Sequence, residues 1–261
     1  MSGESDKEQL AEGTLISHLL ELRDRLLRAL IAVAICAAPC LYFQNEIYDF
    51  VANPIMAQMP PGSKMIAIQI ISPFMAPFKL ACLVGLFIAI PYVLWQLWGF
   101  VAPGLYKHEK KFAIPLVVSS ILLFYTGVAF AYEFVFPVIF KYFIDNAPKS
   151  TQVLPDITQY LDFVITMSLC FGVAFEVPVA VVLLAVTGII SVEKMASARG
   201  YVLIGIFIIA AILTPPDAVS QCIMAVPMYL LYEGGVVMAR IMHKMRREAA
   251  SEREKEEAKA S

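Results

Sequence analysis

Long apolar runs constrain the fold of this chain more than any other feature of its sequence. A transmembrane helix needs about 20 apolar residues to cross a hydrocarbon core roughly 30 Å thick. Lipid-exposed backbone must satisfy its own polar groups, which leaves helices or a closed barrel, and the runs lack the alternation of barrel strands. We therefore predict an all-α membrane protein with six spans. The runs are Leu26 to Phe43, Phe74 to Ala102, Phe112 to Phe140, Phe163 to Ile190, Tyr201 to Leu213 and Ala218 to Tyr232.

Prolines within or near the ends of these runs predict how the spans are shaped. Each proline removes a backbone hydrogen bond and bends its helix unless neighbours compensate. We therefore expect tilted, Pro-kinked helices that form a concave, cupped bundle. The prolines concerned are Pro39, Pro91, Pro115, Pro137, Pro178 and Pro227.

The last two runs are short. Tyr201 to Leu213 would give about 20 Å of helix at 1.5 Å per residue, and only Thr214 to Asp217 separates it from the final run. This hairpin either lies behind other helices or thins the membrane locally, and we favour thinning.

Lysine and arginine placement predicts the orientation. If the chain starts in the cytoplasm, only four of its 20 basic residues fall in outer segments. The rest lie on the inner side, as the positive-inside rule requires. We therefore predict a multi-pass membrane protein with both termini cytoplasmic. The four outer residues are Lys64, Lys79, Lys141 and Lys149.

The polarity of the chain predicts three regions. Residues 1–14 form a polar cytoplasmic N-terminus, 15–240 the membrane domain, and 241–261 a charged cytoplasmic tail that is a solvated helix or disordered. The outer segments Gln44 to Pro73, with an amphipathic stretch at Ile47 to Met59, and Asp145 to Gln159 are expected to form an outer cap.

The sequence carries little that suggests bond chemistry. With 59% hydrophobic and 16% charged residues, the chain does not have the composition of a water-soluble domain. Its five cysteines lie inside apolar runs, as buried small hydrophobes do. No nucleotide loop, metal cluster or nucleophile–base pair is recognisable, so we expect no enzyme activity, no cofactor, no metal and no nucleic-acid partner.

Two inner segments each carry an acid among basic residues. In Ser17 to Leu26, Glu21 with Arg25 and Asp24 with Arg28 are spaced to pair along a helix, which favours a self-paired helix on the inner interface. The segment Trp98 to Lys111 leaves the second span on the same side and contains Glu109. Two carboxylates at one inner mouth could each accept a planar guanidinium, which lysine cannot imitate.

A third acid, Glu176, lies midway along the fourth run. An acid at the centre of a membrane helix is unfavourable by about 3 kcal/mol on insertion scales, so we expect Glu176 to face a cavity or a partner. Glu133, Asp162 and Glu233 lie closer to the ends of their runs, where snorkelling and interfacial exposure suffice.

These segments resemble the TatC family of twin-arginine protein translocase subunits, over roughly Leu15 to Arg240. The likeness rests on the order of four motifs and agrees with the number and orientation of the spans. It implies a receptor in a bacterial cytoplasmic (inner) membrane. Such a receptor recognises signal peptides bearing consecutive arginines and exports folded proteins using the proton-motive force. The motifs are Ser17 to Leu26, Phe100 to Glu109, Phe171 to Pro178, and Leu213 to Asp217.

The resemblance also implies roles for particular residues and partners. Glu176 would lie near the inserted signal peptide, and Thr214 and Gln221 would dock TatA-like and TatB-like single-span proteins. Pro54 and Asp217 would maintain the outer face, and self-association and contact with membrane lipids are expected. The implied signal-peptide-binding residues are Glu21, Leu22, Arg23, Phe100, Leu105, Lys107 and Glu109.

Two other functions fit the pattern of residues alone. A proton-coupled solute transporter could use Glu176 as its proton site, but such transporters usually have internal repeats, and none is evident. A membrane scaffold with no transport role is the second alternative.

Overall fold

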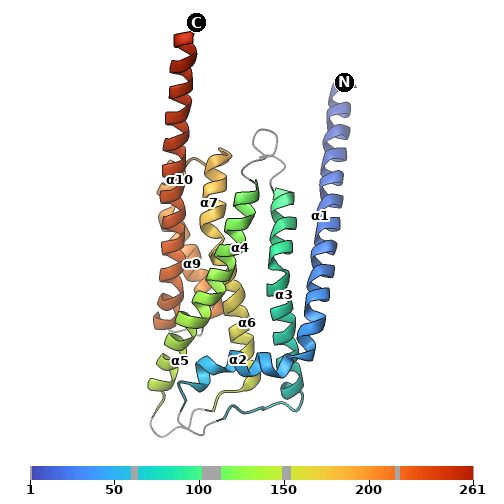
Figure 1. Cartoon of the computed structure of the whole chain (residues 1–261), viewed down its shortest axis with the longest axis vertical. Coiled ribbons are helices and arrows are strands. Elements are labelled where there is room, and N and C mark those ends of the chain that lie inside the picture. The colour runs from blue at the N-terminus through green and yellow to red at the C-terminus, as the bar shows by residue number, and fades with distance from the viewer. Residues whose placement is uncertain (1, 60–63, 102–112, 149–153, 215–217, 261) are drawn as a thin grey trace. The chain divides into compact units, whose positions relative to one another are not determined.

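The computed structural model describes residues 2–59, 64–101, 113–148, 154–214 and 218–260 (Figure 1). These residues are almost entirely helical, with a single-pair parallel bridge between Ile66 and Asp156. The chain divides into two compact units. One comprises residues 1–50 and 73–121, and the other comprises 51–72 and 122–261.

The predicted membrane spans are confirmed in number. Five helical stretches are long and apolar enough to cross a membrane, and Arg199–Leu213 is a sixth, shorter apolar helix. The orientation of the termini stays a prediction. The five longer stretches are Ser17–Tyr42, Ser72–Phe100, Ile114–Asp145, Ile157–Val186 and Ala218–Met245.

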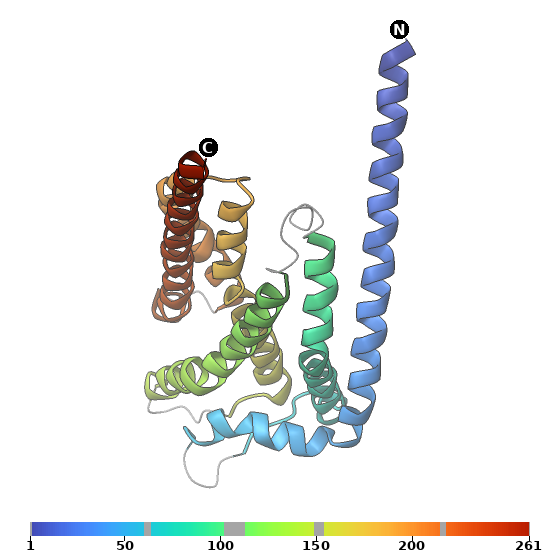
Figure 2. The same cartoon turned by 45° about the horizontal axis from the view of Figure 1, so that its top comes forward.

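The first unit is built on α1 (Ser2–Tyr42) and α3 (Ser72–Val101), which lie side by side (Figures 1 and 2). Their backbones come closest at Gly85 of α3, where an added Cβ would lie 2.4 Å from the Ala37 Cα. Glycine is therefore required at position 85. The first part of α4 (Ala113–Phe130) completes the unit, and the buried Trp98 indole donates a 2.9 Å hydrogen bond to Ser120 of α4.

The prediction that Ser17 to Leu26 forms a helix along the inner interface is wrong. The segment is an uninterrupted part of α1, which continues to Tyr42. The sequence from Thr14 to Ala38 contains neither glycine nor proline, so nothing breaks the helix between the polar segment and the span.

In the second unit, the third span is longer than predicted. After α4, the π-helical turn η3 (Ala131–Val135) leads directly into α5 (Phe136–Asp145). This span packs on α6 (Ile157–Ala174) through aromatic rings, with centroids 6.2 Å apart for Phe136 and Phe163 and 5.3 Å apart for Phe140 and Tyr160. Asp145 therefore ends a helix rather than beginning a loop.

The fourth span is two helices rather than one bent helix. The α6 helix ends at Ala174 and α7 (Val177–Val186) begins after Glu176, with Pro178 in its first turn. Proline is favoured in a first turn because its missing N–H has no partner there. By contrast, α3 continues through Pro77 and Pro91, so the predicted effect of the prolines differs from span to span.

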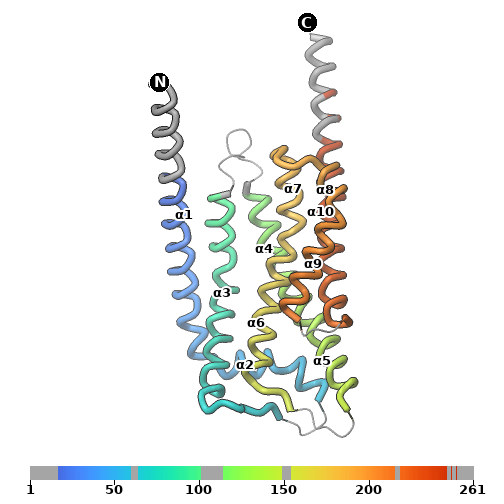
Figure 3. Tube along the Cα trace, turned by 180° about the vertical axis from the view of Figure 1, so that it is seen from behind, coloured from blue at the N-terminus to red at the C-terminus, as the bar shows by residue number. Residues whose placement is uncertain are grey.

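The prediction of a short last span is wrong. After α8 (Val192–Ser197) and the 15-residue α9 (Arg199–Leu213), α10 runs from Ala218 to Ala260, and its spanning part reaches Met245 (Figure 3). The acid and glycines at 233–235 ended the apolar run in the sequence. In the structure Gly235 is a contact point instead, because an added Cβ would lie 2.8 Å from the Pro178 Cα. Of the last two spans, only α9 is short enough to thin the membrane locally. The C-terminal tail, expected to be either a solvated helix or disordered, is helical.

The two segments expected to form the outer cap are linked by hydrogen bonds in the second unit. The predicted amphipathic stretch forms α2 (Gln44–Met56), and the Tyr160 hydroxyl of α6 donates a 2.6 Å hydrogen bond to the Val51 carbonyl. Asp156 caps α6 by accepting the Thr158 and Gln159 amides, and its other oxygen accepts the Ile68 amide at 3.0 Å. These three backbone N–H groups hold the pKa of the Asp156 carboxyl below its usual range.

We predict that Gly85→Ala destabilises the protein by about 1 to 3 kcal/mol, because the new methyl group meets the α1 backbone rather than a movable side chain. The measurement is the unfolding free energy in detergent. Gly205→Ala is the matched control, since no atom lies within 4 Å of a Cβ added there. An equal effect of the two substitutions would contradict the close approach of α1 and α3.

We also predict an acid-sensitive outer segment. Because the folded pKa of Asp156 is lowered, its stabilising effect is complete above the ordinary aspartate pKa of about 3.9 and is lost as the pH falls through the lower folded value. Hydrogen exchange at the Ile68 and Thr158 amides should therefore accelerate, relative to the intrinsic rate, below about pH 4. In Asp156→Asn, protection of these amides should be weaker at neutral pH and should lack this acid-dependent step.

Candidate functional site

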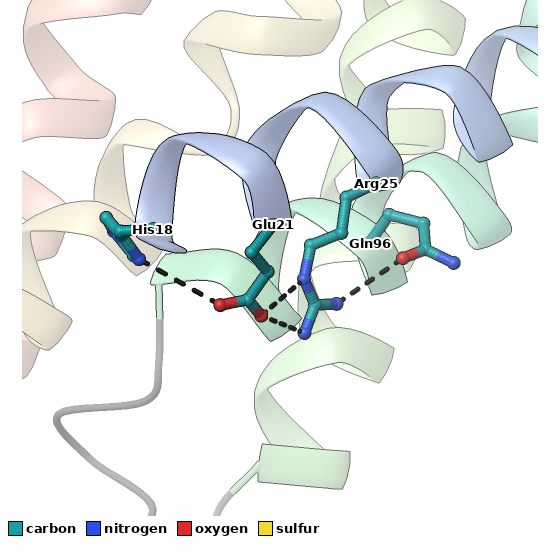
Figure 4. Close-up of polar contacts among 4 residues, drawn as sticks. All are labelled: His18, Glu21, Arg25 and Gln96. Carbon is teal, nitrogen blue, oxygen red and sulfur yellow. Dashed lines mark hydrogen bonds and ion pairs between the residues drawn. The ribbon is translucent and has the colours of Figure 1, made fainter. Parts of the chain in front are cut away.

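An ion pair on α1 forms the centre of the candidate site (Figure 4). The Arg25 Nε and Nη2 atoms donate to the same Glu21 oxygen, Oε1, at 2.9 and 2.7 Å. The predicted pairing of Glu21 with Arg25 is thus confirmed. The predicted pairing of Asp24 with Arg28 is not what the structure has, because Asp24 accepts its hydrogen bonds from the adjacent Arg23.

Helix α3 holds the Arg25 guanidinium from the other side. Its Nη1 donates to the Gln96 side-chain oxygen at 3.4 Å (Figure 4). A Cβ added to Gly99 would lie 2.5 Å from the same nitrogen, so the guanidinium occupies the space that glycine leaves open. Sequence reasoning missed Gln96 and Gly99, because nothing in the α3 sequence indicates which of its faces meets α1.

His18 and Phe100 form a second contact between the two helices. The rings stack with centroids 4.3 Å apart and planes 16° apart. His18 also lies one turn from Glu21, with Nδ1 3.9 Å from Oε2. Phe100 was predicted as a site residue and His18 was not, although its spacing from Glu21 was a usable signal.

Only one of the two Glu21 carboxylate oxygens is engaged by Arg25. Arg25 engages Oε1, whereas Oε2 is approached only to 3.9 Å by His18 among the residues that the structure describes, and 40% of the side chain is exposed. Leu22 and Arg23 are also exposed. A partly neutralised, accessible carboxylate can bind a cation or another hydrogen-bond donor.

Leu105, Lys107, Glu109 and Asp217 lie outside the described residues. The meeting of Glu21 with Glu109 therefore stays a prediction.

Glu176 lies in the break between α6 and α7. Both of its carboxylate oxygens are buried. Its backbone continues the chain of hydrogen bonds, since its N–H donates to Val173 and its carbonyl accepts from Ala180. The acid thus lies inside the protein at a point where two helices meet end to end.

The residues expected to dock partners differ in accessibility. Thr214 is buried, and its hydroxyl donates to the Ala210 carbonyl at 2.8 Å, whereas Gln221 is half-buried on α10. Pro54, expected on the outer face, is a buried residue of α2. Of the polar pair, Gln221 has the more available side chain.

Snorkelling does not explain Glu233. Its two oxygens accept from Arg199 Nε and Nη2 at 2.6 and 2.8 Å, and the Tyr229 hydroxyl donates to it at 3.0 Å. This fork ties the start of α9 to α10 and neutralises the acid. Because the Arg199 and Glu233 side chains remain 40% and 25% exposed, the pair is partly solvated and contributes modestly to stability.

We predict that Gly99→Ala displaces Arg25 while leaving the fold intact, because the methyl group meets the end of a flexible side chain. Gln96→Ala should lower the free energy of unfolding by about 1 kcal/mol in the native protein. It should lower it by almost nothing in a protein that already carries Gly99→Ala. A double-mutant cycle of unfolding free energies measures this coupling. Gly200→Ala, where nothing lies within 4 Å of the added Cβ, is the control. Additive effects of Gly99→Ala and Gln96→Ala would contradict the contact.

Comparison with known proteins identifies the family. The sequence model for TatC, the Sec-independent protein translocase protein, matches residues 17–227. The TatC protein of Azotobacter chroococcum mcd 1 is 50% identical over 245 residues, which cover 94% of this chain and 95% of that protein. TatC of Escherichia coli (strain K12) is also 50% identical, over 226 residues that cover 87% of this chain and 88% of the relative.

Solved structures agree with the sequence relatives. Two crystal structures of the twin-arginine translocase receptor TatC superpose with TM-scores of 0.77 and 0.79, at 36% and 35% identity. The first superposition covers 86% of this chain and 98% of the solved chain, and the second covers 85% and 99%. The sequence match and the shared fold together establish that the chain belongs to the TatC family of Sec-independent protein translocase proteins.

Proposed function

We propose that this chain is the signal-peptide receptor and core subunit of a twin-arginine translocase. It exports folded proteins bearing twin-arginine signal peptides across the membrane, using the proton-motive force. Membership of the TatC family supports the translocase role. The observation that carries the receptor role is the Glu21 side chain, which is 40% exposed, with Oε1 engaged by Arg25 and Oε2 approached only to 3.9 Å by His18 among the described residues.

Arg25 acts as the resident counter-ion of Glu21. It partly neutralises Glu21, so the carboxylate does not stand as a bare charge beside the membrane. An incoming guanidinium can donate to Oε2 without displacing Arg25 from Oε1. Arginine presents a planar fork of N–H donors that matches a carboxylate, whereas lysine presents a point charge. The site should therefore prefer arginine to lysine.

The remaining receptor residues surround this carboxylate in our proposal. Glu109 receives the second arginine of the signal peptide, and the ring stack with His18 orients Phe100 beside the first. The apolar stretch of the signal peptide then continues along the spans toward Glu176. The supporting residues are Leu22, Arg23, Leu105 and Lys107.

The proposed assembly adds single-span partners. TatA-like and TatB-like proteins dock at the last hairpin, with Gln221 as the accessible contact and Thr214 as a buried support, since its hydroxyl is bonded within α9. Pro54 and Asp217 maintain the outer face, and both termini lie in the cytoplasm. Copies of the chain associate with one another in the working complex.

We predict that a twin-arginine signal peptide binds the purified protein about 10- to 100-fold more tightly than its twin-lysine counterpart, which is the range expected for charge-assisted hydrogen bonds. Glu21→Gln should remove most of this difference. Fluorescence titration of labelled peptides in detergent or nanodiscs measures it.

Asp24→Asn is the matched control, because Asp24 is a carboxylate on the same helix that is already bonded to Arg23. It should leave the preference for arginine unchanged. Equal affinities for the two peptides, or an unchanged preference in Glu21→Gln, would refute the receptor site.

A further inference from the structure

Glu133 lies deeper in the membrane-spanning region than its sequence position indicated. The third span runs without a break to Asp145, so Glu133 is about 18 Å from its outer end at 1.5 Å per residue. The midplane of a bilayer core lies about 15 Å from each face. Interfacial snorkelling, which suffices for an acid near the end of a span, does not reach this depth.

The aromatic contacts with α6 confirm this level. Phe136 meets Phe163, and Phe130 meets Phe171 with centroids 5.8 Å apart. Glu133 therefore lies between these two contacts, level with Met167 on α6. Met167 is about 15 Å along α6 from its start at Ile157. Both helices thus place the carboxylate about 15 to 18 Å from their ends, close to the half-thickness of a bilayer core, about 15 Å.

The third span has two different faces around Glu133. One face is packed inside the unit, where Ala131, Phe136 and Ile139 are fully buried. The π-helical turn inserts an extra residue here, which keeps Phe136 and Ile139 on the buried face and leaves Glu133 on the opposite one. The acid is thus held on the outside of the span by the backbone itself.

The exposed face has the composition of a helix-packing surface. Ala129 and Thr126, one and two turns before Glu133, are small and exposed, and small residues let a second backbone approach closely in lipid. The Thr126 hydroxyl is bonded to the Leu122 carbonyl at 2.7 Å, so its methyl group is free for packing. Larger side chains border this strip: Leu122, Phe134 and Val138, which are 63%, 63% and 51% exposed.

We propose that this surface, residues 122–138 of the third span, is a docking face for one membrane-crossing helix of another protein that carries a lysine or arginine at the depth of Glu133. The face is about 24 Å long, which suits one crossing helix lying along it. A basic side chain would neutralise the acid where lipid cannot solvate it. The docking face is separate from the last hairpin, where the single-span translocase partners are proposed to bind.

Photocrosslinking with synthetic helices tests the docking face. The full-length protein in nanodiscs is mixed with a crossing peptide that carries a photoreactive leucine and one lysine about 15 Å from its outer end. A second peptide has norleucine in place of the lysine. The lysine peptide should crosslink to residues 122–138 about tenfold more than the norleucine peptide, the ratio typical of one polar contact between membrane helices.

Two variants probe the two parts of the face. Glu133→Gln should reduce crosslinking of the lysine peptide to near the norleucine level. Ala129→Leu keeps the acid but blocks the close approach, and should reduce crosslinking of both peptides. Circular dichroism and thermal unfolding establish that each variant is folded, and arginine-dependent signal-peptide binding should be unchanged in both.

Three results would overturn the proposal. They are equal crosslinking of the lysine and norleucine peptides, an undiminished signal in a folded Glu133→Gln, and crosslinks of the lysine peptide to other spans of the protein in place of residues 122–138. Because signal-peptide binding is measured separately, failure of the docking face leaves the receptor role standing.

Discussion

Every polar group that this chain carries into the membrane must find a partner, and this requirement shapes the whole structure. Backbone groups satisfy it within helices. Charged side chains satisfy it by pairing with an opposite charge, as Glu21 does with Arg25 on the same helix and Glu233 does with Arg199 on another. The two pairs differ in how many carboxylate oxygens the arginine engages. Arg199 occupies both oxygens of Glu233, whereas Arg25 occupies one oxygen of Glu21.

That difference separates a structural ion pair from a candidate binding site. A carboxylate whose two oxygens both accept from one guanidinium fork offers less to a ligand than one with an oxygen left over, and Glu233 serves to join α9 to α10. A carboxylate held through one oxygen is stable without a ligand and can still accept one. The glycine at position 99 is part of this arrangement, because it makes room for the guanidinium against α3.

Small residues set where the helices meet. Gly85 brings α3 against Ala37 of α1 in the first unit, and Gly235 brings α10 against Pro178 in the second. In lipid, helices gain little from apolar burial alone, so close backbone contact provides much of the packing energy. By the same rule, Thr126 and Ala129 indicate a place where another helix could pack, because these small residues allow close backbone contact on an exposed face.

The sequence alone determined the class of fold, the number of apolar spans and the pairing of Glu21 with Arg25, because apolar run length and i, i+4 spacing are local properties. The four motifs in order also determined the family. Tertiary structure decided what depends on neighbours distant in sequence. The Glu233–Gly235 segment looked like the end of a span until Arg199 and Pro178 supplied its partners. Gln96 and Gly99 became site residues only when α3 was placed against α1.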